Sequence, residues 1–130
     1  MTTCVIDSSA ILTFVFGEPG AEAASDWLDR GATASTVILQ EVATKLRQRG
    51  FTPADAAEAI GVLGLTVADH TLPLALAAAD LYAGTRARGL SHGDRSCLAL
   101  AAAMGLPALT ADKAWSELGE VVEVTVEQVR

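Results

Sequence analysis

Short apolar runs alternate along the chain with longer segments whose apolar residues recur at helical spacing, as Leu39, Val42 and Leu46 do. The short runs predict strands at 2–6, 32–35, 65–67, 108–110 and 121–126. The helical spacing predicts helices at 10–16, 21–30, 36–49, 54–63, 73–88 and 96–104, with one further turn at 114–118. Strands that alternate with helices indicate an α/β fold with a short, mostly parallel sheet. Without a linker or repeat, residues 1–130 are expected to form one domain.

Composition adds that the core consists of small aliphatic side chains, since 51% of residues are hydrophobic and only 5% aromatic. Cys4 and Cys97 lie in separate apolar runs without metal-type spacing, which predicts buried, reduced thiols. The first residues lack the basic segment of a signal peptide, and the apolar run 10–16 is shorter than the ~20 residues that span a bilayer. We therefore expect a cytoplasmic protein without membrane contact.

The net charge of −7 argues on its own against a nucleic-acid partner. The distribution of charge weakens that argument, because basic residues gather at 45–49 and at 86–95. An acidic chain can act on a polyanion when cations neutralise its acids and a basic rim contacts the backbone. Net charge therefore decides neither for nor against a nucleic acid.

Four acids fall where the predicted elements begin or end. Asp7 ends the first strand and Asp112 follows the fourth, while Glu41 and Asp94 lie in the first turns of helices. Sites in open parallel sheets form outside the carboxyl ends of the strands, so the four acids are expected to converge there. Clustered carboxylates repel one another unless they bind a cation, and an oxygen-only ligand set suits Mg²⁺ or Mn²⁺. Such a site favours hydrolysis of a phosphate or phosphodiester.

Each acid also has a structural interpretation. Asp7 and Asp94 could each cap a helix, stabilising it by ~1 kcal/mol. Glu41 could pair with Lys45 one turn later, and Asp112 could belong to a turn. The joint placement of all four acids favours the metal site.

The same residues carry a resemblance to a known family. The four acids stand in the segments VIDSSAIL, LQEVATKL, LSHGDRSCLALA and ALTADKAW, in that order. This order resembles PIN-domain ribonucleases and, more narrowly, the VapC toxins of type II toxin–antitoxin pairs, over nearly the whole chain. The resemblance implies a PIN-like three-layer α/β/α sandwich and Mg²⁺- or Mn²⁺-dependent endonucleolytic cleavage of RNA. It also implies a VapB-like antitoxin and a homodimer, which could form a heterotetramer or larger assembly with the antitoxin.

The resemblance also implies roles for individual residues. Asp7 and Asp94 would be the main metal ligands, and Glu41 and Asp112 would complete the acidic pocket. Two hydroxyl residues would steady the acids, Ser9 and Thr110. The candidates for RNA contact are Lys45, Arg47, Arg86, Arg88 and Arg95, each of which could equally lie on a solvated helix face.

The predicted helix 10–16 is apolar nearly all round. It carries Ile11, Leu12, Phe14, Val15 and Phe16. Deep burial and an exposed strip for a partner both explain this composition. The family resemblance implies that the antitoxin contacts this helix at least in part.

We expect in-line attack of an activated water on an RNA phosphodiester, which leaves a 5′-phosphate and a 3′-hydroxyl, with Glu41 or Asp112 orienting the water. Two histidines are assigned no catalytic role, His70 and His92. An aspartyl phosphatase or a receiver module would need a second acid near Asp7, where Ser8 and Ser9 stand. A structure-specific DNA nuclease would need an additional arch. A PIN nuclease that processes RNA without being a toxin, and a catalytically idle PIN interaction domain, are the alternatives.

Overall fold

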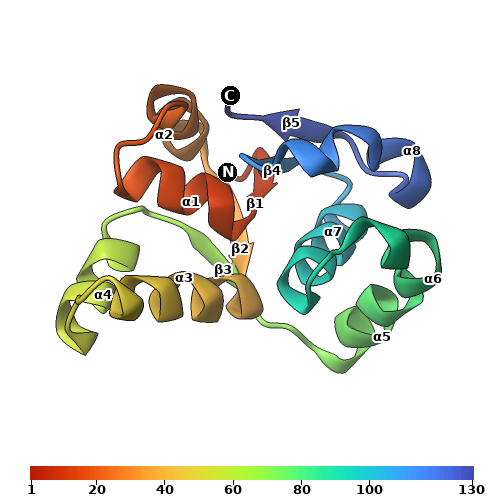
Figure 1. The fold of residues 1–130 in the computed structure, drawn as a ribbon, viewed down its shortest axis with the longest axis horizontal. Coiled ribbons are helices and arrows are strands. Elements are labelled where there is room, and N and C mark those ends of the chain that lie inside the picture. Colours follow the sequence, from red (N-terminus) through yellow and green to blue (C-terminus); the bar gives the residue numbers. More distant parts are fainter.

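Five short strands form one sheet in the order β3-β2-β1-β4-β5, and every neighbouring pair is parallel. The computed structural model describes residues 1–130 (Figure 1). The strands are β1 (Cys4–Ile6), β2 (Ala32–Ser35), β3 (Thr66–Ala68), β4 (Ala108–Thr110) and β5 (Val126–Gln128).

Eight α-helices surround the sheet. They are α1 (Ser8–Val15), α2 (Ala21–Arg30), α3 (Thr36–Gln48), α4 (Pro53–Gly61), α5 (Leu72–Asp80), α6 (Tyr82–Thr85), α7 (His92–Met104) and α8 (Gly119–Val122). Two 3-10 helices complete the chain, η1 (Arg86–Arg88) and η2 (Lys113–Glu117). In Figure 1, α1 to α4 lie on one side of the strands and α5 to α7 on the other. The predicted α/β/α sandwich is confirmed, with a fully parallel sheet.

Local sequence explains where the helices begin. Ser35 and Thr52 accept hydrogen bonds from the first turns of α3 and α4, and Thr71 does so for α5. Ser91 and Asp94 form a reciprocal capping box at the start of α7. Each cap occupies a backbone N–H that the helix itself leaves without a partner.

The core is built around α7, which packs against α3 and α5 and against β1, β2 and β4. Residues 96–101 of this helix are buried without interruption. Cys4 and Cys97 are buried and unpaired, as the sequence predicts, and burial raises the pKa of the Cys4 thiol to about 11. None of the helices has the length and hydropathy needed to cross a membrane.

Two predicted elements are wrong. The helix predicted at 73–88 is divided into α5, α6 and η1, and Tyr82 faces solvent. Gly84 of α6 packs so closely on α8 that a Cβ there would lie 3.1 Å from Val121 Cγ1, so tertiary packing decides this segment. The strand predicted at 121–126 begins instead as α8, turns at Glu123 in the left-handed region (φ 55°), and becomes β5 at Val126.

The strand order changes direction between β1 and β4, which is where open parallel sheets form a crevice. From β1 the chain moves outward to β2 and β3, and it then returns to β4 on the other side of β1. Right-handed crossovers in opposite directions leave a gap at the carboxyl ends of these two neighbouring strands. Asp7 follows β1 directly and Asp112 follows β4 after one residue, so both acids border the crevice.

Candidate active site at the carboxyl edge of the sheet

Asp7 is the most deeply buried acid, with 2% of its surface exposed. Its Oδ1 accepts hydrogen bonds from the Ser9 hydroxyl at 2.8 Å and from the Ala10 N–H at 3.0 Å. Its Oδ2 accepts one from the Thr110 hydroxyl at 2.9 Å. Burial raises the pKa of Asp7 to about 6, although the three hydrogen bonds oppose that shift. Asp7 is thus both the cap of α1 and a carboxyl group that loses its proton only at about pH 6.

The same hydroxyl groups join the ends of β1 and β4. The Ala111 N–H donates to Ser9 Oγ at 2.9 Å, and the Asp112 N–H donates to Thr110 Oγ1 at 3.0 Å. The two hydroxyl oxygens lie 3.1 Å apart. Ser9 and Thr110 therefore hold the first acid and the loop that carries the fourth.

Asp94 is the third residue of α7. Its Oδ2 accepts the Ser91 N–H at 2.9 Å, while its own N–H donates to Ser91 Oγ at 3.1 Å. This capping box leaves Oδ1 of Asp94 without a hydrogen bond. Burial raises the pKa of Asp94, with smaller contributions from Glu41 and Asp112.

Glu41 reaches this group from α3, because α3 and α7 pack together. A Cβ built on Gly93 would lie 2.5 Å from Glu41 Oε1, so only glycine admits the carboxylate here. The other oxygen of Glu41 faces the Lys45 ammonium at 3.8 Å. Gly93 therefore allows Glu41 to approach the backbone beside Asp94.

The four acids are close enough to affect one another's pKa values. Asp94 contributes to the raised pKa of Asp7, and Glu41 and Asp112 contribute to that of Asp94. The buried Cys97 thiol has a raised pKa because of burial first, followed by the charges of Asp7 and Asp94. The four acids thus gather at the sheet edge, and the acidic site is defined as Asp7, Glu41, Asp94 and Asp112.

No three His, Cys, Asp or Glu side chains are arranged so that they could hold a metal ion as they stand. Carboxylates that no cation neutralises repel one another, and this repulsion favours an arrangement in which they stay apart. The donor set nevertheless fits a hard cation, because three of the acids keep an oxygen without a hydrogen bond: Glu41, Asp94 and Asp112. Asp7 Oδ2 accepts one hydrogen bond and has a further lone pair.

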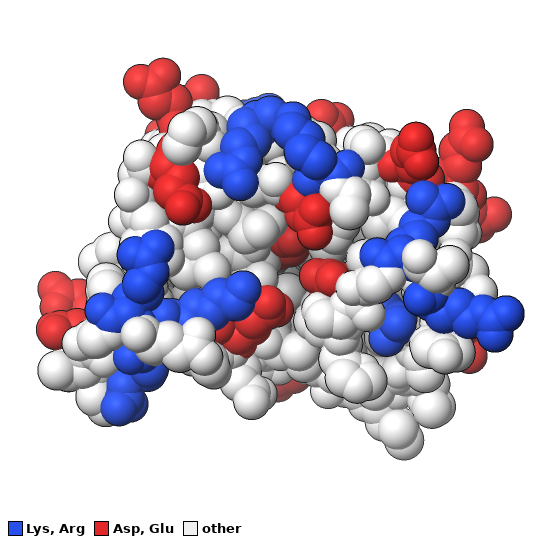
Figure 2. All heavy atoms as spheres, in the orientation of Figure 1, with Lys and Arg blue, Asp and Glu red and all other residues white.

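Three hollows adjoin one another near the acidic site, although only Glu41 of its four acids lines one of them. The first, of about 410 Å³, includes Ser9, and the second, also about 410 Å³, includes Glu41. Lys45 lines both of these hollows. The third, of about 690 Å³, meets the second at His92 and is mainly apolar. Figure 2 shows acidic atoms near the centre of this face with basic side chains to either side and above.

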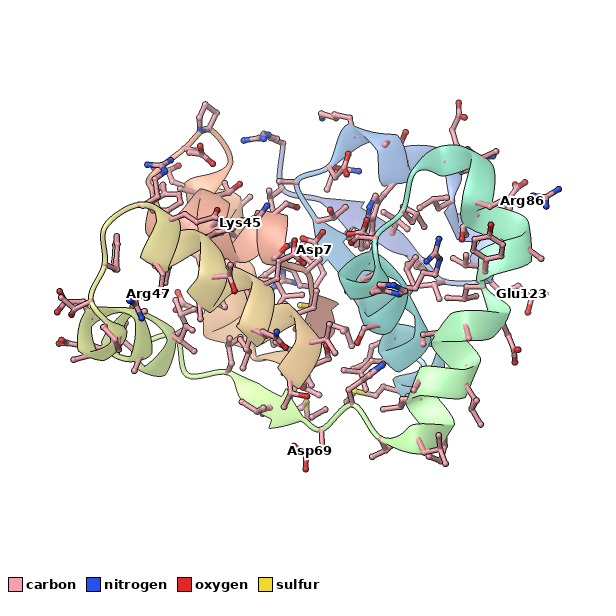
Figure 3. The ribbon with its side chains drawn as sticks, turned by 60° about the horizontal axis from the view of Figure 1, so that its bottom comes forward. Asp7, Lys45, Arg47, Asp69, Arg86 and Glu123 are labelled. Atoms are coloured by element: carbon pink, nitrogen blue, oxygen red, sulfur yellow. The ribbon has the colours of Figure 1, made fainter.

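Only some of the basic residues that are candidates for RNA contact line the hollows. Lys45 lines two hollows and Arg95 lines the third, where its guanidinium lies 5.2 Å from the Tyr82 ring. Arg47 lies beside α4 and Arg86 at the outer edge of the molecule, both away from Asp7 (Figure 3). Arg88 pairs with Glu117 at 3.6 Å. RNA contact by these three arginines is still only a prediction.

The apolar residues of α1 belong mainly to the core. Ile11 and Leu12 are buried, and Phe14, Val15 and Phe16 are half-buried against the core cluster. Burial therefore accounts for most of the apolar surface of this helix. An antitoxin contact through its half-buried end stays a prediction.

Sequence reasoning misses several residues that line the hollows. His92 and Tyr82 line the apolar hollow, and Arg49 and Arg130 line the first. The basic cluster at 45–49 is a signal for Arg49, whereas nothing in the sequence connects Arg130 with an acid at position 7. His70, which the sequence assigns no role, contacts Ser96 Oγ through Nδ1 at 3.0 Å.

Replacing Asp7 by Asn should stabilise the protein at neutral pH in the presence of a chelator. The folded protein holds the Asp7 proton up to about pH 6, whereas the unfolded chain releases it near 3.8, so the free energy of unfolding falls as pH rises across this window. The asparagine side chain has no proton to lose, so the free energy of unfolding of the variant does not fall in this way. At about pH 8 it should exceed that of the wild-type protein by about 3 kcal/mol. The Asn amide can donate to Thr110, whose hydroxyl can turn toward Ser9.

Urea unfolding at about pH 8 and about pH 4 measures this difference, which should vanish at the lower pH. Asp69→Asn, at an exposed acid, is the matched control and should follow the wild-type protein. An Asp7→Asn variant less stable than wild type at both pH values would contradict the assignment.

The chain resembles known proteins in fold more than in sequence. No curated protein is significantly similar to it in sequence. Among solved structures, VapC20 of Mycobacterium tuberculosis, a sarcin-ricin-loop-cleaving toxin, has a TM-score of 0.74 at 20% identity, over 90% of this chain and 95% of that one. The DNA-bound VapBC of Salmonella typhimurium gives 0.74 at 16% identity, with 100% of both chains covered. FitAB bound to an IR36 DNA fragment gives 0.69 at 15% identity, over 98% of this chain and 95% of that one.

At such low sequence identities, the similarity to these structures supports the fold alone. The sequence profile of the PIN domain matches residues 4–121, which include the whole acidic site. The chain therefore belongs to the PIN domain family.

Proposed function

We propose that this protein is a metal-dependent endoribonuclease and the toxin of a type II toxin–antitoxin pair. The observation that carries the proposal is the placement of four acids at the β1–β4 crevice. Asp7 and Asp112 follow the neighbouring strands β1 and β4, and Asp94 and Glu41 lie on the packed helices α7 and α3. Asp7 is buried, and a buried carboxyl group close to other acids is costly to the fold, which is expected of a site kept for chemistry. The toxin assignment is supported by the fold shared with VapC20, a toxin by its description.

Asp7 and Asp94 would hold a Mg²⁺ or Mn²⁺ ion, and Glu41 and Asp112 would complete the site. When bound, such an ion supplies activation of water and stabilisation of the charge that develops on the phosphoryl oxygens. The residues around it have separate tasks. Ser9 and Thr110 fix the Asp7 carboxylate through their hydrogen bonds.

Glu41 and Asp112 are the candidates to orient and deprotonate the attacking water, because each has an oxygen without a hydrogen bond. Attack in line with the leaving group would produce a 5′-phosphate and a 3′-hydroxyl. A 2′,3′-cyclic phosphate product would exclude this route.

Cleavage of a fluorogenic RNA tests the proposal directly. Purified protein should cleave in Mg²⁺ or Mn²⁺ and stop in chelator, and Asp94→Asn should lower the rate by about 100-fold or more. The exposed Asp69→Asn, purified identically, should retain the activity of the wild-type protein. Equal activity of Asp94→Asn and wild type would assign the cleavage to a contaminant.

Gly93→Ala tests the position of Glu41 without removing a carboxylate. The added Cβ would displace Glu41 Oε1, and a shift of about 1 Å in a catalytic group can lower the rate by ~100-fold. The melting temperature should be unchanged or higher, because alanine favours helix more than glycine does. Gly61→Ala in α4, where a Cβ meets nothing within 4 Å, is the matched control. Full activity of Gly93→Ala would remove Glu41 from the site.

A VapB-like antitoxin and a homodimer complete the proposal. Structures of similar fold are described as VapBC and FitAB, and one as a toxin–antitoxin complex, which supports an antitoxin partner here. For the dimer, the support is an exposed apolar group on α5 and α6: Leu72 is 71% exposed, Leu76 58% and Tyr82 55%. Exposed apolar groups of this kind mark contact surfaces in soluble proteins.

Light scattering of the protein without antitoxin should give a dimer at micromolar concentration. Leu76→Glu should shift it to monomer, because a charge would be buried at the contact. Val62→Glu at the end of α4, a similar change at an exposed residue outside this group, should remain dimeric. A monomeric wild-type protein would contradict the dimer.

A further inference from the structure

The hollow beside Ser9 extends from the acidic site along the gap between α1 and the end of α3. Its walls include Ser9 and Phe16 from α1 and its cap, Lys45 from α3, and Arg49 and Arg130 from the segments that follow α3 and β5. We name it the cationic hollow. Ser9 also donates to Asp7 Oδ1, so the hollow begins at the acids themselves.

Positive charge in the cationic hollow exceeds negative charge. Lys45, Arg49 and Arg130 line it, against the single acid Glu18. Lys45 faces Glu41 at 3.8 Å, but neither arginine forms a salt bridge. In a chain with 16 acidic and 9 basic residues, two arginines that line one hollow without a salt bridge are unexpected. Like charges raise each other's energy, so an anion bound between them would relieve that repulsion.

Arg49 is also pre-oriented. Its Cζ lies 4.0 Å from the centroid of the Phe16 ring, so its planar group is stacked and its N–H edges remain free. Arg130 donates one hydrogen bond, to the Pro19 carbonyl at 3.2 Å, and keeps its other N–H groups. A guanidinium held in this way loses little freedom when it binds a phosphate.

The other two hollows are less suited to binding a phosphate group. The hollow at Glu41 has Lys45 as its one Lys or Arg, and that residue faces the acid. The apolar hollow has Arg95 as its one Lys or Arg, stacked near Tyr82. The phosphates of an RNA strand bound at the acidic site would favour the hollow with excess positive charge.

We propose that the cationic hollow binds a backbone phosphate of the RNA strand next to the scissile phosphodiester, through Arg49 and Arg130. This inference rests on the proposed function and adds the path of the substrate to it. Arg49 and Arg130 are substrate-binding residues in this proposal. The strand passes from the acids, over Ser9, toward the end of α3.

Binding of a fluorescently labelled single-stranded RNA in chelator, followed by anisotropy over a range of salt concentrations, tests the contact without cleavage. Each lost phosphate contact on a single strand lowers the slope of log K against log salt by ~0.7. Arg49→Ala and Arg130→Ala should each show this change, which corresponds to about fivefold weaker binding near 0.1 M salt. Arg49→Lys keeps the charge and should keep the slope.

Arg30→Ala is the matched control, because Arg30 also stacks on an aromatic ring, 3.9 Å from the Trp27 centroid, but lines none of these hollows. It should leave affinity and slope unchanged. Equal losses in Arg30→Ala and Arg49→Ala would mean that only net charge matters, and would overturn the proposal. Unchanged RNA binding in both Arg49→Ala and Arg130→Ala would overturn it as well.

Steady-state cleavage separates this inference from the proposed function. With Mg²⁺, Arg49→Ala should raise KM about fivefold with kcat unchanged, as loss of a uniform binding contact does. If the wild-type protein cleaves RNA and Arg49→Ala leaves KM unchanged, only the proposed path of the RNA strand is overturned. If the wild-type protein neither binds nor cleaves RNA, both the path and the proposed function are overturned. A loss of affinity in Arg49→Ala for a Glu-rich peptide, but not for RNA, would overturn the path and assign the hollow to a protein partner instead.

Discussion

The buried carboxyl group of Asp7 is the group on which the rest of the site depends. A carboxylate at the end of a buried strand is costly, and three donors compensate for it: Ser9 Oγ, the Ala10 N–H and Thr110 Oγ1. These bonds start α1 at Asp7 and tie β1 to β4 at the crevice. The cost that remains appears in the pKa of Asp7, raised to about 6. A cation that bound there would favour the ionised form and relieve that cost.

Asp112 comes from the loop after the neighbouring strand β4, whereas Asp94 and Glu41 reach the site through helix packing. Asp94 is set by the capping box of α7, and Glu41 approaches over Gly93, where a larger residue would displace it. Acidic side chains therefore occupy the centre and basic ones the rim (Figure 2). This separation explains how a chain of net charge −7 could act on a polyanion. A bound cation would neutralise the acids at the centre, and the basic side chains at the rim would attract the phosphates of the RNA.

Most of the fold can be predicted from the chain, because its strands and long helices obey simple periodicity. The sequence predicts a strand at 32–35 and a helix at 21–30, and both are observed with those bounds. The failures lie where apolar spacing fits two structures. Apolar and polar residues alternate from Val122 to Val126 as in a strand. This segment nevertheless begins with the end of α8, because Val122 and Val124 are buried on either side of a left-handed turn at Glu123. Neighbours distant in sequence decide this segment.

Local spacing and the residue types at element ends are enough to specify four of the five strands and the four acids. The convergence of the acids also follows from them, through the rule that parallel strands present their carboxyl ends at one edge. Which basic residues stand near the acids depends instead on long-range packing. Arg47 and Arg49 are neighbours in the sequence, but α3 ends between them, so one faces α4 and the other the cationic hollow. Arg130 joins Arg49 there because β5 pairs with β4, a long-range contact with no local signature.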